Sequence, residues 1–443
     1  MRKGDGSVRR RIRWGLLPVL VLLLCSLSGC LFQSADELYS LPQLSDDYYN
    51  LQACLDAILT DGVEYAAPVS GSQQQAVQLV DLTGDGEKEA VVFVKTGDER
   101  PLKTYIFQKT DDTYSQVCVI EGEGSAFQSV EYVELNDAGS LELVICRQVS
   151  DQVPQALSVY SPDEDLTVTE LLNVSCTEYL SVDLTGDGVT DLLLLSDDEN
   201  ASGAASLYSW NLGMLEKTGE AAMSTASDAV RRMITGTLED GAPAVFVTST
   251  WDESSIITDV FALREGQLVN VCGDTTSEAR AVRNYYVYAQ DLDDDGAVEL
   301  PQPLLLPAVS EDAESYWLIQ WCSLSLDGTV TGKLLTYHNY AAGWYLELPM
   351  AWRDRITVWR EDSTYVFAEW TEDGETELLF SIGTAASGEE IPADSTLLLE
   401  QNGASFYLTL EADAADRDAA FTAENLSSGF HLIQTDWNTG EMQ

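Results

Sequence analysis

Apolar positions along this chain follow one period near the amino terminus and another over most of the remaining length. Between Tyr48 and Leu59 they recur at three- and four-residue spacing, which predicts one short amphipathic helix. From about residue 75 onward, short runs of β-branched, aromatic and alternating residues are separated by clusters of Gly, Asp, Asn and Ser, as is typical of antiparallel β-structure. The clearest predicted strands are Glu89 to Lys95, Thr104 to Lys109, Leu141 to Arg147, Asp191 to Ser196, Ala205 to Trp210, Ala244 to Thr250 and Ile256 to Leu263.

The first residues of the chain predict export. Six basic residues precede an apolar run from Gly15 to Leu27 that is too short to span a bilayer. The run ends in Leu27-Ser28-Gly29-Cys30, which resembles a bacterial lipobox, and the resemblance implies cleavage before Cys30 and a diacylglycerol group on its thiol. We therefore expect a signal peptide over residues 1–29, a tether over 30–47 and an extracytoplasmic protein anchored to the cell membrane through Cys30. An ordinary signal peptide or short anchor with an incidental cysteine is the alternative.

Three acidic turns in the β-rich part share one pattern, and their spacing reveals a repeat. The turns begin at Asp81, Asp183 and Asp291, and the glycines at their sixth positions are 102 and 108 residues apart. Two further turns, in which the acidic pattern is incomplete and which we call degenerate, lie at the midpoints. The turn glycines therefore recur at intervals of 53, 49, 53 and 55 residues. These glycines are Gly86, Gly139, Gly188, Gly241 and Gly296. A period near fifty in an all-β chain is typical of a propeller, in which each repeat forms a four-stranded blade.

The repeat also predicts the domain organisation. The next period would fall near Pro349, where no acidic turn appears. We expect a helix and lead-in over residues 48–74, propeller repeats over 75–337 and a C-terminal α+β domain over 338–443, although this last region could instead supply further blades. Its predicted elements are the strands Arg355 to Arg360, Tyr365 to Trp370 and Glu377 to Ile382, and a helix around Glu411 to Ala423. The predicted fold is thus mainly β, a β-propeller of about 50-residue four-stranded blades between a short N-terminal helix and this domain.

Oxygen-bearing side chains stand at positions one, three, five and nine of the three strong turns, where they could converge on one hard cation. Calcium takes six to eight oxygen ligands in a flexible geometry, and glycine at position six permits a sharp turn around the ion. Position seven differs in each turn, which indicates a backbone carbonyl ligand there. The predicted calcium ligands are Asp81, Thr83, Asp85, Glu87, Glu89, Asp183, Thr185, Asp187, Val189, Asp191, Asp291, Asp293, Asp295, Ala297 and Glu299.

The flanks of the turns separate two kinds of calcium loop. An EF-hand requires an acid at position twelve and flanking helices, whereas position twelve here is Val92, Leu194 or Gln302 and strands flank the turns. The D-L-T-G-D-G core, which occurs twice in full, instead resembles the calcium loops of FG-GAP and VCBS repeats, which build integrin-type propellers. The resemblance covers about residues 75 to 335. That family usually has Asp or Asn at position three, where two turns here have Thr, so the turn with Asp293 has the richest oxygen set.

Two alternatives concern the ion. The turns could be acidic turns that bind no metal, because Asp and Gly favour turns by themselves. If calcium binds, we expect a structural role, since a site whose ligands come mostly from the protein leaves little room for a substrate. The degenerate turns at Gly139 and Gly241 lack the carboxylates, and we expect them to bind no ion.

Composition narrows the classes of partner. Removal of residues 1–29 leaves 17 basic and 73 acidic residues, a net charge of −56, which repels nucleic acid and anionic headgroups. Four of the six remaining cysteines lie in strand-like runs, where we expect small buried apolar side chains, and no pair has the CxxC spacing of a zinc or redox site. The six are Cys54, Cys118, Cys146, Cys176, Cys272 and Cys322.

Catalytic motifs are missing from the sequence. It has two histidines, His338 and His431, and neither a G-x-S-x-G motif nor a phosphate-binding glycine loop. We therefore predict a non-enzymatic, calcium-stabilised binding or scaffolding module with a protein or carbohydrate ligand. The alternative is a secreted carbohydrate-active or hydrolytic enzyme on a propeller framework, and a third hypothesis places the function in the C-terminal domain. We expect the aromatic residues from Tyr337 to Trp352 to pack the last repeat against that domain.

Overall fold

The computed structural model describes residues 46–111, 113–136, 138–149, 155–273, 281–284, 287–292, 294–310, 313–371, 375–386, 388–401 and 403–433. The predicted signal peptide, Cys30 and most of the tether lie outside these residues. Within them, no helix is both long and apolar enough to cross a membrane. The chain separates by its contacts into two compact units, which are described in turn.

The smaller unit contains, among the described residues, 46–61 together with 109–111 and 113–115. Its helix α3 (Asp46–Ile58) buries Leu51 and Leu55, which lie four residues apart and therefore on one face. The Sγ atom of Cys54 lies 3.2 Å from the carbonyl oxygen of Tyr114, which ties the helix to the β-hairpin segment of the same unit. The helix occupies the segment where the sequence predicts one.

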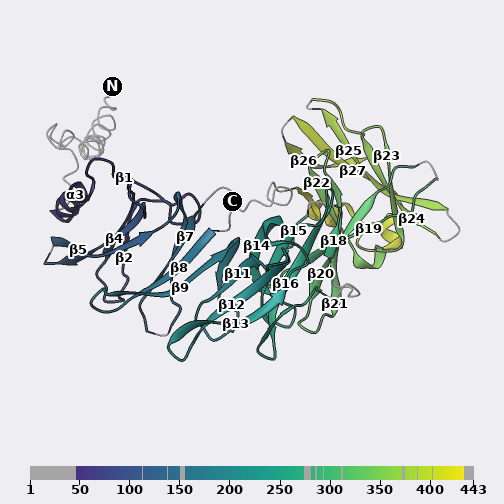
Figure 1. Cartoon of the computed structure of the whole chain (residues 1–443). Helices are drawn as coiled ribbons and strands as arrows, with labels where there is room; N and C mark the ends of the chain where they lie inside the picture. The colour runs from purple at the N-terminus through teal and green to yellow at the C-terminus, as the bar shows by residue number, and fades with distance from the viewer. Residues whose placement is uncertain are drawn as a thin grey trace, which may run out of the picture. The chain divides into compact units, whose positions relative to one another are not determined.

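The larger unit begins with four antiparallel sheets that follow one another along the chain (Figure 1). Each contains four strands in sequence order, and short extra strands extend the first and the fourth sheet. The strands are β1 (Glu64–Tyr65), β2 (Val77–Val80), β3 (Glu89–Lys95), β4 (Leu102–Thr110) and β5 (Thr113–Gly122); β6 (Ala126–Val133), β7 (Glu142–Gln148), β8 (Gln155–Pro162) and β9 (Val168–Cys176); β10 (Glu178–Val182), β11 (Asp191–Asp197), β12 (Gly203–Asn211) and β13 (Met214–Ala222); and β14 (Val230–Thr237), β15 (Pro243–Thr250), β16 (Ile256–Arg264), β17 (Gln267–Asn270) and β18 (Ala281–Arg283). Four-stranded sheets built from about fifty residues are propeller blades, which confirms the predicted fold class.

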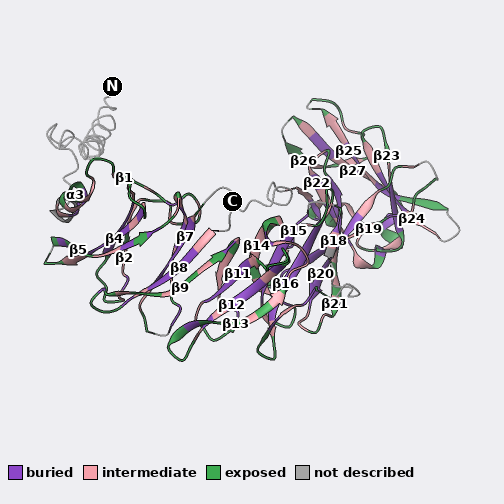
Figure 2. Cartoon of the chain, viewed as in Figure 1, coloured by how far each residue is buried: buried purple, intermediate pink, exposed green. Residues whose placement is uncertain are grey.

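The second strand of each blade is buried on both faces, as Figure 2 shows in purple for β7 and β11. Along β7, alternate side chains enter different cores. Leu143 and Ile145 pack with residues of the first blade, whereas Val144 and Cys146 pack with residues of the third. The apolar side chains thus form their cores between consecutive blades, which explains why these strands are continuous apolar runs in the sequence.

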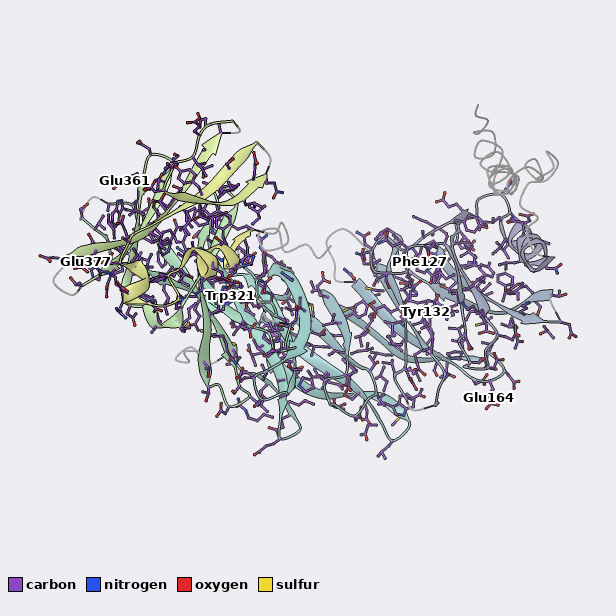
Figure 3. The ribbon with its side chains drawn as sticks, turned by 180° about the vertical axis from the view of Figure 1, so that it is seen from behind. Phe127, Tyr132, Glu164, Trp321, Glu361 and Glu377 are labelled. Carbon is purple, nitrogen blue, oxygen red and sulfur yellow. The ribbon has the colours of Figure 1, made fainter. Side chains whose placement is uncertain are left out.

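Polar contacts also join consecutive blades. The hydroxyl of Tyr132 on β6, a residue labelled in Figure 3, donates a hydrogen bond of 2.6 Å to the Oε1 atom of Gln78 on β2. The hydroxyls of Ser129 on β6 and Tyr179 on β10 lie 2.8 Å apart. Each blade therefore presents both apolar and hydrogen-bonding groups to the blade that follows.

Two five-stranded sheets follow. The fifth has the order β19 (Leu300–Leu305), β20 (Trp317–Leu324), β21 (Val330–Asn339), β22 (Trp344–Leu348) and β28 (Phe430–Leu432); the sixth has the order β23 (Ile356–Glu361), β24 (Thr364–Trp370), β25 (Thr376–Ala386), β27 (Ala404–Leu410) and β26 (Ser395–Gln401). One apolar core contains buried side chains of both sheets. Four short helices complete the described chain: η1 (Ser227–Ala229), η2 (Met350–Trp352), α4 (Ala414–Arg417) and α5 (Ala423–Ser428).

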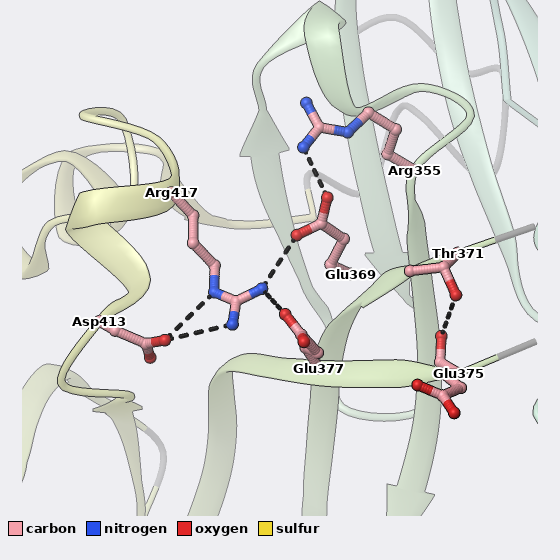
Figure 4. Close-up of polar contacts among 7 residues, drawn as sticks. All are labelled: Arg355, Glu369, Thr371, Glu375, Glu377, Asp413 and Arg417. Carbon is pink, nitrogen blue, oxygen red and sulfur yellow. Dashed lines mark hydrogen bonds and ion pairs between the residues drawn. The ribbon is translucent and has the colours of Figure 1, made fainter.

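A charged network fixes helix α4 to the sixth sheet (Figure 4). The guanidinium of Arg417 on α4 bonds to the carboxylates of Glu369 on β24 and Glu377 on β25, and it also bonds to Asp413 at the helix start. Arg355 donates a second hydrogen bond to Glu369, at 2.6 Å. The two arginines lower the pKa of the Glu369 carboxyl through hydrogen bonds and charge.

The C-terminal elements differ in detail from the expectation. A single helix is predicted around Glu411 to Ala423, but the structure has the two short helices α4 and α5, because Asp418 between them takes an extended conformation. Residue 338, where we place a domain boundary, lies within β21, so a division there would cut through the fifth sheet. The three predicted strands in this region are present as β23, β24 and β25.

Candidate metal-binding loops

The aspartate loops occupy equivalent places in successive blades. Those starting at Asp81, Asp183 and Thr237, and the one at Glu134, each join the first strand of a blade to the second, and the loop starting at Asp291 leads into β19. Backbone hydrogen bonds join some neighbouring loops directly. The amide of Leu141 donates to the carbonyl oxygen of Leu82 at 2.9 Å. The amide of Thr190 donates to the carbonyl oxygen of Glu134 at 3.1 Å, and that of Thr237 donates to Gly296 of the loop that follows at 3.0 Å.

The first aspartate closes each strong loop through backbone amides. Asp81 accepts hydrogen bonds from Gly84 at 2.8 Å and from Gly86 at 2.9 Å. Asp183 accepts the equivalent two bonds at 2.7 and 2.9 Å, and Asp291 accepts one from Gly296 at 2.8 Å. The glycine at position six has a φ near +90° in all three loops, a conformation that a side chain would strain.

The acid at position five is the most exposed of the set. In each strong loop its Oδ1 atom accepts a hydrogen bond from the amide of position seven, at 2.8 to 2.9 Å. The position-five residues are Asp85, Asp187 and Asp295, and their side chains remain open to solvent. The side chain of Glu87 at position seven is exposed, whereas that of Ala297 is buried and apolar. Only its backbone carbonyl could therefore serve as a ligand at Ala297.

The acid at position nine has a second role that the sequence does not reveal. Glu89, Asp191 and Glu299 are all at most 3% exposed. Each accepts a hydrogen bond from the backbone amide of position two, at 2.9 to 3.0 Å, and so pins the start of the loop to the second strand. Burial raises the pKa of the Glu89 carboxyl, and the nearby Asp85 adds to this effect, although the amide of Leu82 opposes it.

In the degenerate second loop, the acid at position nine again accepts a hydrogen bond from the amide of position two, and two side chains also donate to it. Glu142, at position nine, accepts hydrogen bonds from the amide of Leu135 at 2.9 Å, the side-chain amide of Asn136 at 2.5 Å and the hydroxyl of Ser161 at 3.0 Å. Asn136 stands at position three, where the strong loops carry an oxygen ligand. Its side-chain amide therefore donates a hydrogen bond to the position-nine carboxylate instead of offering an oxygen to an ion.

In the part of the strong loops that the structure describes, there is no ready-made carboxylate cage. Among the described residues, which leave out Asp293, no group of three or more acidic, histidine or cysteine side chains lies close enough together to hold a metal ion. The Oγ1 atom of Thr83, at position three of the first loop, is buried without a hydrogen-bond partner. The donor set is oxygen only, which fits a hard cation such as calcium.

The cysteines and the aromatic cluster lie outside these loops. All six described cysteines are free, and Cys146, Cys176, Cys272 and Cys322 are buried, as small apolar side chains would be. In the aromatic region, Trp321, Tyr337 and Trp344 are at most 3% exposed. The Tyr337 ring contacts Phe367 of the sixth sheet, with 5.2 Å between centroids. Tyr337 and Trp344 thus lie in the core shared by the fifth and sixth sheets, whereas Trp321 packs with Val287 and Ile319.

His338 gives this region a testable pH dependence. Its side chain is buried, with Nε2 lying 2.9 Å from the hydroxyl of Thr336, and burial lowers its pKa from 6.5 to about 3. The unfolded chain takes up this proton near pH 6.5, whereas the folded chain does not until about pH 3. The stabilising effect is therefore complete above pH 6.5 and is lost as pH falls toward 3.

We expect this one group to lower the free energy of unfolding by about 2 kcal/mol between pH 7 and pH 5. Urea unfolding of wild type and His338→Phe at both pH values measures it. Buried carboxylates such as Glu89, whose raised pKa acts in the opposite direction, are common to both proteins and cancel in the comparison. Equal pH dependence in the two proteins would contradict the prediction.

Comparison with known proteins adds little to this description. No family model matches the sequence, and no curated protein matches it. Similar solved structures include the Dos1 propeller, at 8% identity and a TM-score of 0.27, covering 78% of this chain and 81% of that one. Sqt1 of Chaetomium thermophilum has 11% sequence identity and a TM-score of 0.29, and the match covers 74% of this chain and 93% of Sqt1. A Bacillus licheniformis rhamnogalacturonan lyase has 10% sequence identity and a TM-score of 0.28, and the match covers 71% of each chain. Overlays this weak carry no argument, so the fold assignment rests on the blades themselves.

Proposed function

We propose that the protein is an exported, lipid-anchored and non-enzymatic binding or scaffolding module, in which calcium stabilises a propeller of the FG-GAP and VCBS type. The observation that carries this proposal is the recurrence of one oxygen-rich loop in every second repeat, where it joins the first two strands of the first and third blades and leads into β19 of the fifth sheet. Loops placed in this way link the two strands of a blade and, through backbone hydrogen bonds, some neighbouring loops. An ion bound there would stiffen the framework without occupying a substrate site.

Electrostatics supports a stabilising ion. The whole chain carries 74 acidic and 23 basic residues, and in the strong loops several carboxylates stand within nine residues of one another. Their mutual repulsion opposes the compact loop, and a divalent cation would remove it. An ion that binds only the folded protein stabilises it by about 2.7 kcal/mol at one hundred times its dissociation constant. The membrane anchor at Cys30 would hold this framework outside the cell.

Thermal unfolding of residues 31–443 with calcium, with magnesium or with a chelator tests the ion. We expect calcium to raise the melting temperature by several degrees, which corresponds to about 2–3 kcal/mol per site near saturation. Asp295→Ala should lose part of this shift, because it removes the exposed carboxylate of the third loop.

Asp252→Ala is a matched control. Asp252 is an exposed acid outside the loops whose Oδ1 atom accepts one backbone hydrogen bond from Ser254 at 2.9 Å, just as Asp295 accepts one from Ala297 at 2.8 Å. Its replacement should change the melting temperature equally with and without calcium. A wild-type protein that melts at one temperature in calcium and in chelator would refute the proposal.

A further inference from the structure

A cavity of about 370 Å³ lies between the first and second blades, and its lining residues belong to none of the aspartate loops. Its walls include residues of β5 from the first blade and of β7, β8 and β9 from the second. The volume falls within the ~300–1,000 Å³ that is typical of small-molecule sites. Arg147 and Tyr160 are at most 6% exposed and form its floor, whereas Arg100, Glu123 and Glu170 are exposed and form its mouth.

The guanidinium of Arg147 presents one nitrogen to this cavity. Its Nη2 atom donates a hydrogen bond of 2.6 Å to the hydroxyl of Ser158, and its Nε atom is buried without a partner. The Nη1 atom has no hydrogen-bond partner in the described part of the chain, yet it is not among the buried atoms, so it belongs to the accessible part of the side chain. It lies against the backbone of Gly122, another lining residue, where a Cβ atom would collide with it.

Arg147 thus carries a buried positive charge without a neighbouring negative one. None of the ion pairs between described residues includes it. A guanidinium does not lose its proton in proteins, so the charge remains, and buried charges in proteins are paired as a rule. A carboxylate matches the planar guanidinium well. A carboxylate on a ligand in this cavity would therefore supply the missing partner.

The mouth of the cavity adds charges of both signs. Glu121, which also lines it, is already engaged in an ion pair with Lys103 at 3.3 Å. The other charged residues of the lining are two basic and two acidic side chains: Arg100, Arg147, Glu123 and Glu170. An inorganic dianion such as sulfate would be repelled by the two acids of the mouth. A ligand with an anionic and a cationic group suits this lining, because it can place the first at the floor and the second at the mouth.

We infer that this cavity binds a small zwitterion of the amino-acid class, whose carboxylate accepts from Arg147 and whose ammonium group lies beside Glu123 and Glu170. The inference rests on the proposed binding role and names its class of ligand, but it does not depend on calcium. The C-terminal residue of a peptide shares the carboxylate with a free amino acid but lacks the neighbouring ammonium group.

Isothermal titration calorimetry of residues 31–443 with glycine, L-alanine, L-serine, L-leucine and L-phenylalanine tests the inference. We expect saturable binding of at least one of them, equally in calcium and in chelator, which separates this result from the calcium proposal. The amide of that amino acid lacks the carboxylate and should bind at least about thirtyfold more weakly. Its N-acetyl derivative, which also mimics a peptide end, should bind about two- to fivefold more weakly, since the mouth is open to solvent.

Two variants locate the binding. Arg147→Met removes the charge from a long side chain and should weaken binding by at least about thirtyfold. Gly122→Ala keeps the charge, but its Cβ atom would displace the Nη1 atom of Arg147. We expect binding to weaken by at least about tenfold, with little change in melting temperature, because the end of a flexible side chain can move aside.

Gly97→Ala is the matched control for Gly122→Ala. Neither glycine has a positive φ, but a Cβ atom at Gly97 would meet nothing within 4 Å, and Gly97 lies outside the lining. This variant should bind as wild type does. The melting temperature of each variant shows whether it is folded, and Gly122→Ala decides the matter should Arg147→Met fail to fold.

Three outcomes would overturn the inference. The first is the absence of saturable binding for every amino acid in the panel. The second is full binding by a folded Arg147→Met or Gly122→Ala protein. The third is an amide or N-acetyl derivative that binds as tightly as its free amino acid, since that result would show that the cavity does not recognise both charges.

Discussion

Replacement of Glu142 by alanine is expected to lower the free energy of unfolding by about 3–5 kcal/mol. The Glu142 carboxylate is fully buried and accepts hydrogen bonds from the amide of Leu135, the side-chain amide of Asn136 and the hydroxyl of Ser161. Alanine leaves all three donors inside the protein with no acceptor. The loss is large because each buried donor gave up its hydrogen bond to water on folding.

Urea unfolding followed by tryptophan fluorescence measures this loss, with the chelator present so that no ion contributes. Glu142→Gln keeps one carbonyl acceptor and should lose less than the alanine variant. Glu164→Ala is a control at an exposed acid, which lies at the surface in Figure 3, and it should change stability by less than about 0.5 kcal/mol. If the free energy of unfolding of Glu142→Ala lies within about 1 kcal/mol of the wild-type value, the role that we assign to position nine is wrong.

Gly84→Ala should destabilise the protein by about 2–5 kcal/mol, because it combines backbone strain with a collision between repeats. Gly84 has a φ of +78°, and a Cβ atom there would lie 2.3 Å from the carbonyl oxygen of Gly139 in the next loop. Backbone cannot rotate out of the way as a flexible side chain can. The hydrogen bond from Leu141 to Leu82 holds these two loops at that distance.

Gly86→Ala separates the two causes. Gly86 has a similar φ of +91°, but a Cβ atom there would meet nothing within 4 Å. Its replacement should therefore cost only the strain of a left-handed conformation, about 1–2 kcal/mol. Urea unfolding of both variants gives the difference, which is the cost of the collision between the two loops. Equal losses at the two positions would show that the added Cβ atom does not collide with the next loop.

Much of the fold was predictable because burial on both faces leaves a mark in the sequence. The second strand of each blade packs between two cores, so it is a short continuous apolar run, and the first of these runs, Glu89 to Lys95, coincides with β3. The turns between strands need glycine at a positive φ, so the turn glycines mark the repeat. Helix α3 was predictable from its three- and four-residue spacing. The C-terminal helices were not, since α4 and α5 are too short to show a period.

The sequence by itself determined that the chain is mainly β, that it repeats about every fifty residues and that oxygen-bearing side chains recur in its turns, because these properties follow from local periodicity and composition. Only the tertiary structure decided which oxygens are already engaged. Glu142 became a hydrogen-bonding centre because Ser161, nineteen residues away, folds back onto it. Such contacts join residues that are distant in the chain, and no local pattern encodes them.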